Sequence, residues 1–158
     1  MSNHLSSETI AIVKATAPAL QAHGVEITTR MYERLFVNEE VRDMFDQAAQ
    51  ASGEQPRRLA AAILGYAQNI DKLEALSGAV ARMVKRHVDT GVRAEHYPHV
   101  ANALLPAIRD VLISGGDPLS EAATDEVLAA WGEAYWFLAK LLIAAEAEEY
   151  INRSSAAA

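Results

Sequence analysis

One histidine of this chain lies in an otherwise apolar helical stripe. Val80, Met83, Val84 and His87 recur at i, i+3, i+4 and i+7, the spacing that places side chains on one face of a helix. Such a histidine is either a core residue hydrogen-bonded to a neighbour or an axial ligand to a flat apolar metal cofactor. Periodicity alone does not separate these two hypotheses.

The chain contains no cysteine, which excludes disulfides, thiolate catalysis and metal sites built on thiolates. Any metal site must therefore use histidine, carboxylate or tyrosine. His96 and His99 have the i, i+3 spacing of a metal-binding pair, but Pro98 lies between them and a helix is expected to begin nearby. We do not expect this pair to bind a metal.

Length and charge narrow the class of protein. The 158 residues suffice for one domain with a substantial core, and are too few for that domain joined to a separate catalytic module. The N-terminus lacks a cationic segment followed by an apolar core, and no stretch approaches the roughly 20 uninterrupted apolar residues of a membrane span. The net charge of -7 argues against nucleic-acid binding. We therefore expect a cytoplasmic protein with no membrane span and no nucleic-acid partner.

Helical periodicity, without the short alternating runs of strands, predicts an all-α protein. Pro56 suits the first turn of a helix that begins near Gln55, Gly91 ends the helix that carries His87, and Pro106 is expected to bend or break a later helix. The helices are expected over residues 7–23, 25–37, a short segment from 39, 55–70, 76–90, 94–113 and 121–151. Loops are expected over 47–54 and 114–120, and a disordered tail over 152–158.

Several segments, taken in order, resemble one protein family. They are HGVEITTRMYERLF, VRDMFD, EQPRRLA, VKRHVDTGV, HYPHV and EAEEY. Together they resemble the bacterial haemoglobin of the Vitreoscilla type and the globin domain of flavohaemoglobins, from about Leu5 to Tyr150. The resemblance implies a single globin domain over residues 1–151, with helices packed around a b-type haem. It also implies O2, NO and CO as ligands of the haem.

The resemblance makes His87 the proximal ligand of the haem iron, supported from behind by Tyr97 and Glu146. A carboxylate behind the imidazole makes the ligand more electron-donating, which favours activation of bound oxygen over passive storage. Judged from the residues alone, a glutamate that lies among other glutamates is typically exposed to solvent, and this is the alternative for Glu146. Arg86, beside the ligand, would contact a haem propionate.

On the other face of the haem, the resemblance makes Tyr32 the distal tyrosine, whose hydroxyl donates to bound oxygen and slows its release. The alternative is a core tyrosine whose hydroxyl is satisfied elsewhere. Gln55 matches the distal glutamine and Leu59 the apolar residue one turn further on. Phe45 matches the phenylalanine that packs on the porphyrin edge.

The chain departs from the family pattern at two positions of interest. Trp136 stands where relatives carry glycine, and Met31 where they carry an aromatic residue beside the distal tyrosine. We expect Trp136 to narrow a cavity or alter ligand access, and Met31 to loosen the pocket.

Two functions would share this site. The first is reversible oxygen binding or transport that supports respiration at low oxygen. The alternative is a nitric oxide dioxygenase that converts NO and O2 to nitrate, with Tyr32, Tyr97 and Glu146 as catalytic residues. It would need a separate reductase, since the sequence shows no Gly-rich dinucleotide motif and hence no flavin or NAD site.

A third hypothesis, a haem-free globin-like sensor or interaction domain, predicts a colourless protein. The resemblance also implies a homodimer, because relatives pair through their last helices.

Overall fold

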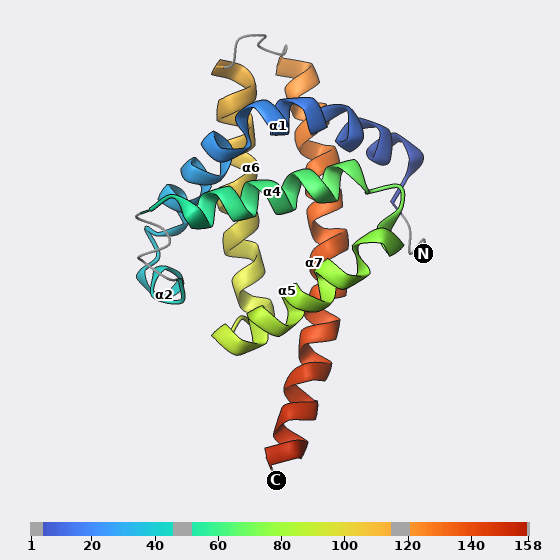
Figure 1. The fold of residues 1–158 in the computed structure, drawn as a ribbon. Coiled ribbons are helices and arrows are strands. Elements are labelled where there is room, and N and C mark those ends of the chain that lie inside the picture. The colour runs from blue at the N-terminus through green and yellow to red at the C-terminus, as the bar shows by residue number, and fades with distance from the viewer. Residues whose placement is uncertain (1–4, 46–51, 115–120, 158) are drawn as a thin grey trace.

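Helices account for nearly all of the part of the chain that the computed structural model describes, residues 5–45, 52–114 and 121–157, and no strand occurs within these ranges (Figure 1). The predicted all-α class is therefore confirmed. The elements are α1 (Ser7–Leu35), α2 (Glu39–Arg42), α4 (Glu54–Gln68), the 3-10 turn η1 (Leu73–Leu76), α5 (Ser77–Thr90), the 3-10 turn η2 (Ala94–His96), α6 (Tyr97–Ser114) and α7 (Glu121–Ala157).

The first helix is longer than predicted. The sequence suggested two helices with a break near Gly24, whereas α1 is continuous from Ser7 to Leu35 and contains Pro18. A Cβ on Gly24 would lie 3.3 Å from the Cβ of Ala60 on α4, so this glycine serves a close helix crossing and not a helix end. Glycine inside a helix costs about 1 kcal/mol relative to alanine, and tertiary packing of this kind offsets such a cost.

The helices around His87, the predicted iron ligand, begin and end close to where the sequence signals place them. Pro56 lies in the first turn of α4, which begins one residue before the predicted start. Gly91 ends α5 in the left-handed conformation, with φ at 83°. Pro106 does not break α6, which runs from Tyr97 to Ser114. The predicted loops over 47–54 and 114–120 lie mostly outside the described residues.

The C-terminal tail differs from the prediction. Residues 152–157 were expected to be disordered, but α7 continues to Ala157 and extends past α5 at the bottom of Figure 1. Arg153 donates to Glu149 one turn earlier, at 2.9 Å, and to Asp89 of α5, at 2.7 Å. These partners hold a turn that would otherwise fray.

Within the described ranges, α7 is long and apolar enough to cross a membrane by length and composition, over Ala123–Ala156, with a mean hydropathy of 1.4 and 28% of that window buried. No span was expected from the sequence, because no stretch approaches roughly 20 uninterrupted apolar residues. A single helix of this kind is weak support for a span, since core helices of soluble proteins share its composition. In this fold α7 packs against α1, α5 and α6.

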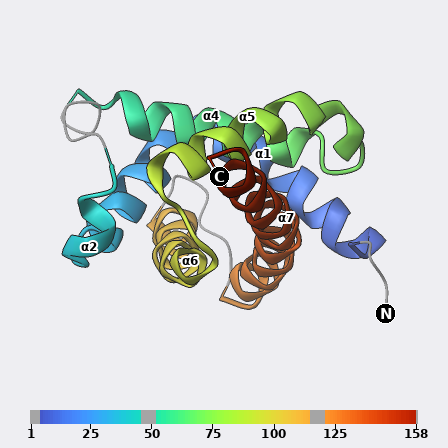
Figure 2. The same ribbon diagram turned by 90° about the horizontal axis from the view of Figure 1, so that it is seen from below.

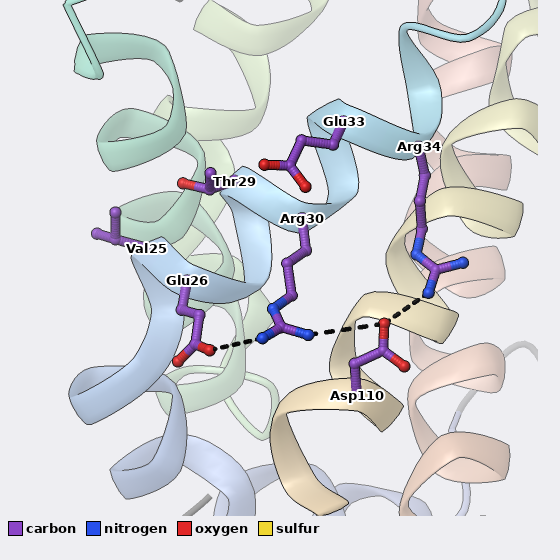
Figure 3. Close-up of a pocket in the computed structure, with 7 residues that line it drawn as sticks. All are labelled: Val25, Glu26, Thr29, Arg30, Glu33, Arg34 and Asp110. Carbon is purple, nitrogen blue, oxygen red and sulfur yellow. Dashed lines mark hydrogen bonds and ion pairs between the residues drawn. The ribbon is translucent and has the colours of Figure 1, made fainter. Parts of the chain in front are cut away.

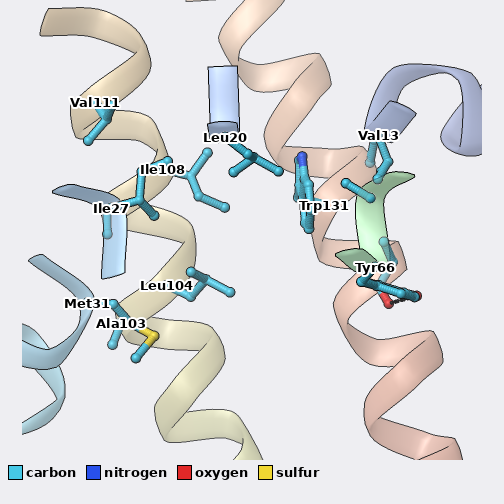
Figure 4. Close-up of a cluster of buried hydrophobic side chains, with 14 of the residues drawn as sticks. Val13, Leu20, Ile27, Met31, Tyr66, Ala103, Leu104, Ile108, Val111 and Trp131 are labelled. Carbon is cyan, nitrogen blue, oxygen red and sulfur yellow. Dashed lines mark hydrogen bonds between the residues drawn. The ribbon is translucent and has the colours of Figure 1, made fainter. Parts of the chain in front are cut away.

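The main core forms where α1 crosses α4, α6 and α7. Figure 4 shows Ile108 of α6 and Trp131 of α7 meeting Leu20 and Ile27 of α1, all of them buried. A second, smaller cluster around Tyr97, Ala139 and Leu142 lies where α5 packs on α7. Viewed from below, α4 and α5 lie on one side of the neighbouring α6 and α7 (Figure 2). The main core therefore holds α4, and the second cluster holds α5.

Candidate functional site

His87 lies in the last turn of α5 with its ring nitrogen Nδ1 fully engaged. Nδ1 is 2.8 Å from Oε2 of Glu146 and 3.1 Å from the hydroxyl of Tyr97. The His87 side chain is 27% exposed, whereas that of Glu146 is 3% exposed. The structure thus brings together the three residues that the resemblance grouped, and buries the carboxylate that composition alone placed in solvent.

The hydrogen bonds to Glu146 indicate which groups of Tyr97 and His87 carry protons. The Tyr97 hydroxyl donates to the two carboxylate oxygens of Glu146, at 2.7 and 2.8 Å. Burial, and then the hydrogen bond to Glu146, raise the pKa of Tyr97 far above its ordinary value, so the phenol keeps its proton. With a carboxylate at 2.8 Å, Nδ1 is the donor nitrogen of the imidazole. In the neutral imidazole the lone pair then lies on Nε2, which has no hydrogen-bond partner in the described chain.

Tyr135 supports this cluster and was not singled out as a site residue from the sequence. Its hydroxyl donates to the backbone carbonyl of Tyr97 at 2.6 Å. Tyr135 lies on α7, three turns before Glu146, so one helix holds both the backbone of Tyr97 and its hydroxyl. No spacing rule predicts a side-chain to backbone contact between two helices.

On the predicted distal side, Tyr32 and Gln55 meet. The amide nitrogen of Gln55 lies 3.4 Å from the Tyr32 hydroxyl, so the amide reaches the distal tyrosine from its place at the start of α4. Tyr32 also joins an aromatic cluster with Phe36 and Phe45, whose ring centroids are 5.3 and 5.4 Å from its own. The sequence predicted Phe45 in the site, and the structure adds Phe36.

Thr28 determines how α4 meets α1 beside this pair. It is fully buried, one turn before Tyr32 on the same face of α1, and its hydroxyl donates to the carbonyl of Pro56 at 2.8 Å. Pro56 directly follows Gln55, so this bond and the Gln55–Tyr32 contact act on adjacent residues. A threonine inside a helix carries no distinctive sequence signal, which is why Thr28 was missed.

The remaining predicted residues occupy varied surroundings. Leu59, one turn after Gln55, packs half-buried on the main core, and Met31 is almost fully buried. Arg86 is exposed beside His87, so its contact with a propionate stays a prediction. Trp136 packs edge-on against Tyr135, with ring centroids 5.2 Å apart. Its effect on ligand access is untested.

The two histidines that were considered and set aside have other surroundings. Nδ1 of His96 accepts from the backbone N–H of Arg93 at 2.9 Å, which caps η2, and His99 is exposed. No group of three or more metal-binding side chains occurs among the described residues.

A surface groove between α1 and α6 lies apart from all these residues (Figure 3). Four of its five charged side chains form ion pairs: Arg30 pairs with Glu26 and Asp110, and Arg34 also pairs with Asp110. The groove is lined by Val25, Glu26, Thr29, Arg30, Glu33, Arg34 and Asp110. These ion pairs tie α1 to α6.

The residues of the site fit haem. Within the described chain α4 packs on α1 and α5 packs on α7, without extensive contact between α4 and α5. Each of these two helices keeps half-buried apolar side chains, Leu59 and Ile63 on α4 and Met83 and Val84 on α5. A flat apolar macrocycle covers such surfaces, and His87 offers its Nε2 lone pair as an iron ligand. When bound, haem would supply an iron that accepts an imidazole ligand and binds a diatomic gas.

Comparison with known proteins identifies the family of the chain. Residues 29–140 match the family model described as Globin. The "Uncharacterized globin-like protein" of Aquifex aeolicus is 48% identical over 147 residues, which cover 92% of this chain and 97% of that protein. A flavohemoprotein of Xylella fastidiosa is also 48% identical, over 142 residues that cover 90% of this chain but 34% of that protein.

A solved structure is similar along the whole fold. It is an engineered carbene transferase from Rhodothermus marinus, a variant of a proposed nitric oxide dioxygenase. It has a TM-score of 0.83 and 41% sequence identity, and the match covers 95% of this chain and 99% of that one. The predicted globin fold is thereby confirmed. Since the family model matches most of the chain and the Aquifex relative matches it nearly end to end, this chain belongs to the globin family, whose members bind gases through haem.

Proposed function

We propose that the protein binds oxygen reversibly at a haem b ligated by His87, with Tyr32 and Gln55 on the gas-binding side. One observation carries the proposal: Nδ1 of His87 is held by Glu146 and Tyr97 while Nε2 has no partner in the described chain. A histidine that binds a metal has one ring nitrogen held by a carboxylate or another acceptor, which orients the ring and leaves the other nitrogen for the metal. The Tyr32–Gln55 pair supplies hydrogen-bond donors for a polar diatomic ligand.

Titration of the purified protein with haem tests the ligand assignment. We expect a Soret band that saturates at one haem per chain, and a His87→Ala variant that loses most of its haem. Tyr66→Phe is the control, since Tyr66 donates to the carbonyl of Ala134 in the core and belongs to no predicted site. A protein that stays colourless after haem addition would support a haem-free sensor or interaction domain instead.

Nitric oxide dioxygenation is a second candidate, and Glu146 favours it. A buried carboxylate bonded to the proximal imidazole strengthens electron donation from the ligand, which helps oxygen chemistry more than oxygen storage. The reaction combines NO with O2 and takes up one electron to give nitrate. Relatives named flavohemoproteins and the proposed dioxygenase of Rhodothermus marinus are consistent with this role. Tyr32, Tyr97 and Glu146 would then be the catalytic machinery.

Stopped-flow mixing of the oxygenated protein with NO separates the two candidates. A dioxygenase gives one nitrate per haem and turns over again once electrons arrive from a reductase outside these 158 residues. An oxygen carrier gives that first nitrate without further turnover when NADH and a cell-derived reductase fraction are supplied.

The proposal includes a homodimer formed by the outer face of α7. Leu141 and Ile151 are 51% and 65% exposed on this face, and both lie near Ala144 on the helical wheel. An antiparallel pairing about a two-fold axis at Ala144 places Lys140 opposite Glu148 of the partner subunit. The face comprises Phe137, Lys140, Leu141, Ala144, Ala147, Glu148 and Ile151.

Light scattering after gel filtration tests this pairing. Lys140→Glu and Glu148→Lys should each weaken the dimer, and the double variant should restore it. A monomeric wild-type protein at millimolar concentration would exclude the pairing.

A further inference from the structure

The last turns of α7, after Glu146, contact the end of the helix that carries His87. Tyr150 lies one turn beyond Glu146, so both side chains face α5. The Tyr150 hydroxyl donates to the backbone carbonyl of Val92 at 2.7 Å. A contact of this length from a half-buried tyrosine fixes the chain just after α5.

Val92 links this contact to His87. The backbone N–H of Val92 donates to the carbonyl of His87 at 2.8 Å, and that of Gly91 donates to the carbonyl of Val88 at 3.2 Å. These two bonds form the Schellman motif that ends α5. Tyr150 therefore reaches the backbone of His87 through one residue, Val92, while Glu146 holds its ring.

Two charged contacts reinforce the same junction. The Arg93 guanidinium stacks over the Tyr150 ring, 4.4 Å from its centroid. Arg153 donates to Asp89, two residues after His87, at 2.7 Å. Each surface ion pair contributes little alone, but Arg153 is also held by Glu149 at 2.9 Å. The junction thus joins the end of α5 to α7 at two places just after His87, at Asp89 and at Val92–Arg93.

We propose that Tyr150 is a positioning residue for the proximal imidazole, and that the turn from Tyr150 to Arg153 clamps α5 so that His87 keeps its short bond to Glu146. The proposal rests on haem ligation by His87, proposed above. The clamp fixes where the His87 backbone lies relative to α7. Because Glu146 is carried by α7, the clamp also fixes the distance from Nδ1 of His87 to the Glu146 carboxylate. Loosening the clamp weakens that hydrogen bond without removing either partner.

Resonance Raman spectroscopy of the ferrous, gas-free holoprotein measures the effect, because the iron–histidine stretching frequency rises with the strength of the bond from Nδ1 to its acceptor. We expect Tyr150→Phe to lower this frequency towards that of Glu146→Gln, and Arg153→Gln to lower it less. Haem transfer to an acceptor globin should become roughly fivefold faster in Tyr150→Phe, as for the loss of one hydrogen bond.

Matched variants separate positioning from general stability. Tyr66→Phe removes a comparable hydrogen bond to a backbone carbonyl, at 2.8 Å from Ala134, in the core away from His87. Arg109→Gln removes a comparable pair, with Asp125 at 2.8 Å. Both controls should lower the melting temperature and leave the Raman frequency at the wild-type value. The proposal is overturned if Tyr150→Phe and Arg153→Gln also keep that frequency.

A second measurement does not depend on haem. In the 15N-labelled apoprotein, the Nδ1–H resonance of His87 should lie far downfield, as expected for a proton shared with a carboxylate, and should move upfield in Tyr150→Phe but not in Tyr66→Phe. An apoprotein whose His87 resonance is insensitive to Tyr150→Phe would reject the clamp even if haem binds as proposed. Failure of haem binding would reject the proposed function and leave this comparison intact.

Discussion

The hydroxyl of Tyr97 lies within 2.8 Å of both carboxylate oxygens of Glu146, and one of these oxygens also lies 2.8 Å from Nδ1 of His87. The carboxylate therefore receives two donors, one neutral phenol and one imidazole N–H. Buried carboxylates are stable only with such partners, so each donor depends on the charge of Glu146.

Replacing Glu146 with glutamine should weaken the proximal bond while keeping the shape of the side chain. The amide cannot accept from two donors with the strength of a carboxylate, and it adds its own N–H groups to a crowded site. We expect the free energy of unfolding to fall by about 1–3 kcal/mol and nitrate formation from NO to slow by about tenfold. Chemical denaturation and stopped-flow kinetics measure the two effects. An unchanged rate with reduced stability would limit Glu146 to a structural role.

Tyr32→Phe should retain haem and release oxygen faster. The variant keeps the ring that packs on Phe36 and Phe45, and removes only the hydroxyl that Gln55 contacts. Loss of a donor near a partly negative ligand costs about 1.5–3 kcal/mol, which corresponds to a tenfold or greater rise in the oxygen dissociation rate. Laser flash photolysis or stopped-flow mixing with CO measures that rate. An unchanged rate would show that Tyr32 does not bond the ligand.

Thr28→Val tests whether the α1–α4 bond positions Gln55. Valine has nearly the shape of threonine and lacks the hydroxyl that donates to Pro56. We expect a loss of about 1–2 kcal/mol of stability and a faster oxygen dissociation rate, since the start of α4 is released beside Gln55. Thr16→Val is the control, because among the described residues the Thr16 hydroxyl bonds within its own helix alone, to the carbonyl of Ile12 at 2.8 Å. Equal oxygen kinetics in both variants would exclude the positioning role.

Stability should fall in alkaline solution. Burial raises the pKa of Tyr66, Tyr97 and Tyr135 above the ordinary value near 10, with Glu146 contributing at Tyr97. Above that value the unfolded state loses protons that the folded state retains, so unfolding becomes easier as pH rises. Each proton that the folded state retains makes the free energy of unfolding fall more steeply, by about 1.4 kcal/mol per pH unit. Urea unfolding between pH 8 and pH 11 measures the slope, and Tyr66→Phe should reduce it.

Much of the fold and site was predictable from local sequence signals. Gly91 and Pro56 marked a helix end and a helix start correctly, because left-handed φ and a missing N–H are properties of single residues. The order of matched segments assigned candidate residues to both sides of the predicted site, and these roles stay predictions. Gly24 misled the prediction, since its small size serves the contact with Ala60 and that contact is invisible in a linear pattern.

The sequence by itself determined the helical class, the absence of thiolate chemistry and the candidate roles of His87, Tyr32 and Glu146, because these depend on residue type, spacing and family resemblance. Only the tertiary structure decided that Glu146 is buried against His87, that Thr28 joins α4 to α1 beside Gln55, and that residues 152–157 continue α7, with Arg153 bonded to Asp89 of α5. Each of these outcomes depends on groups far apart in the chain. Their burial and hydrogen bonds exist only after the helices have packed.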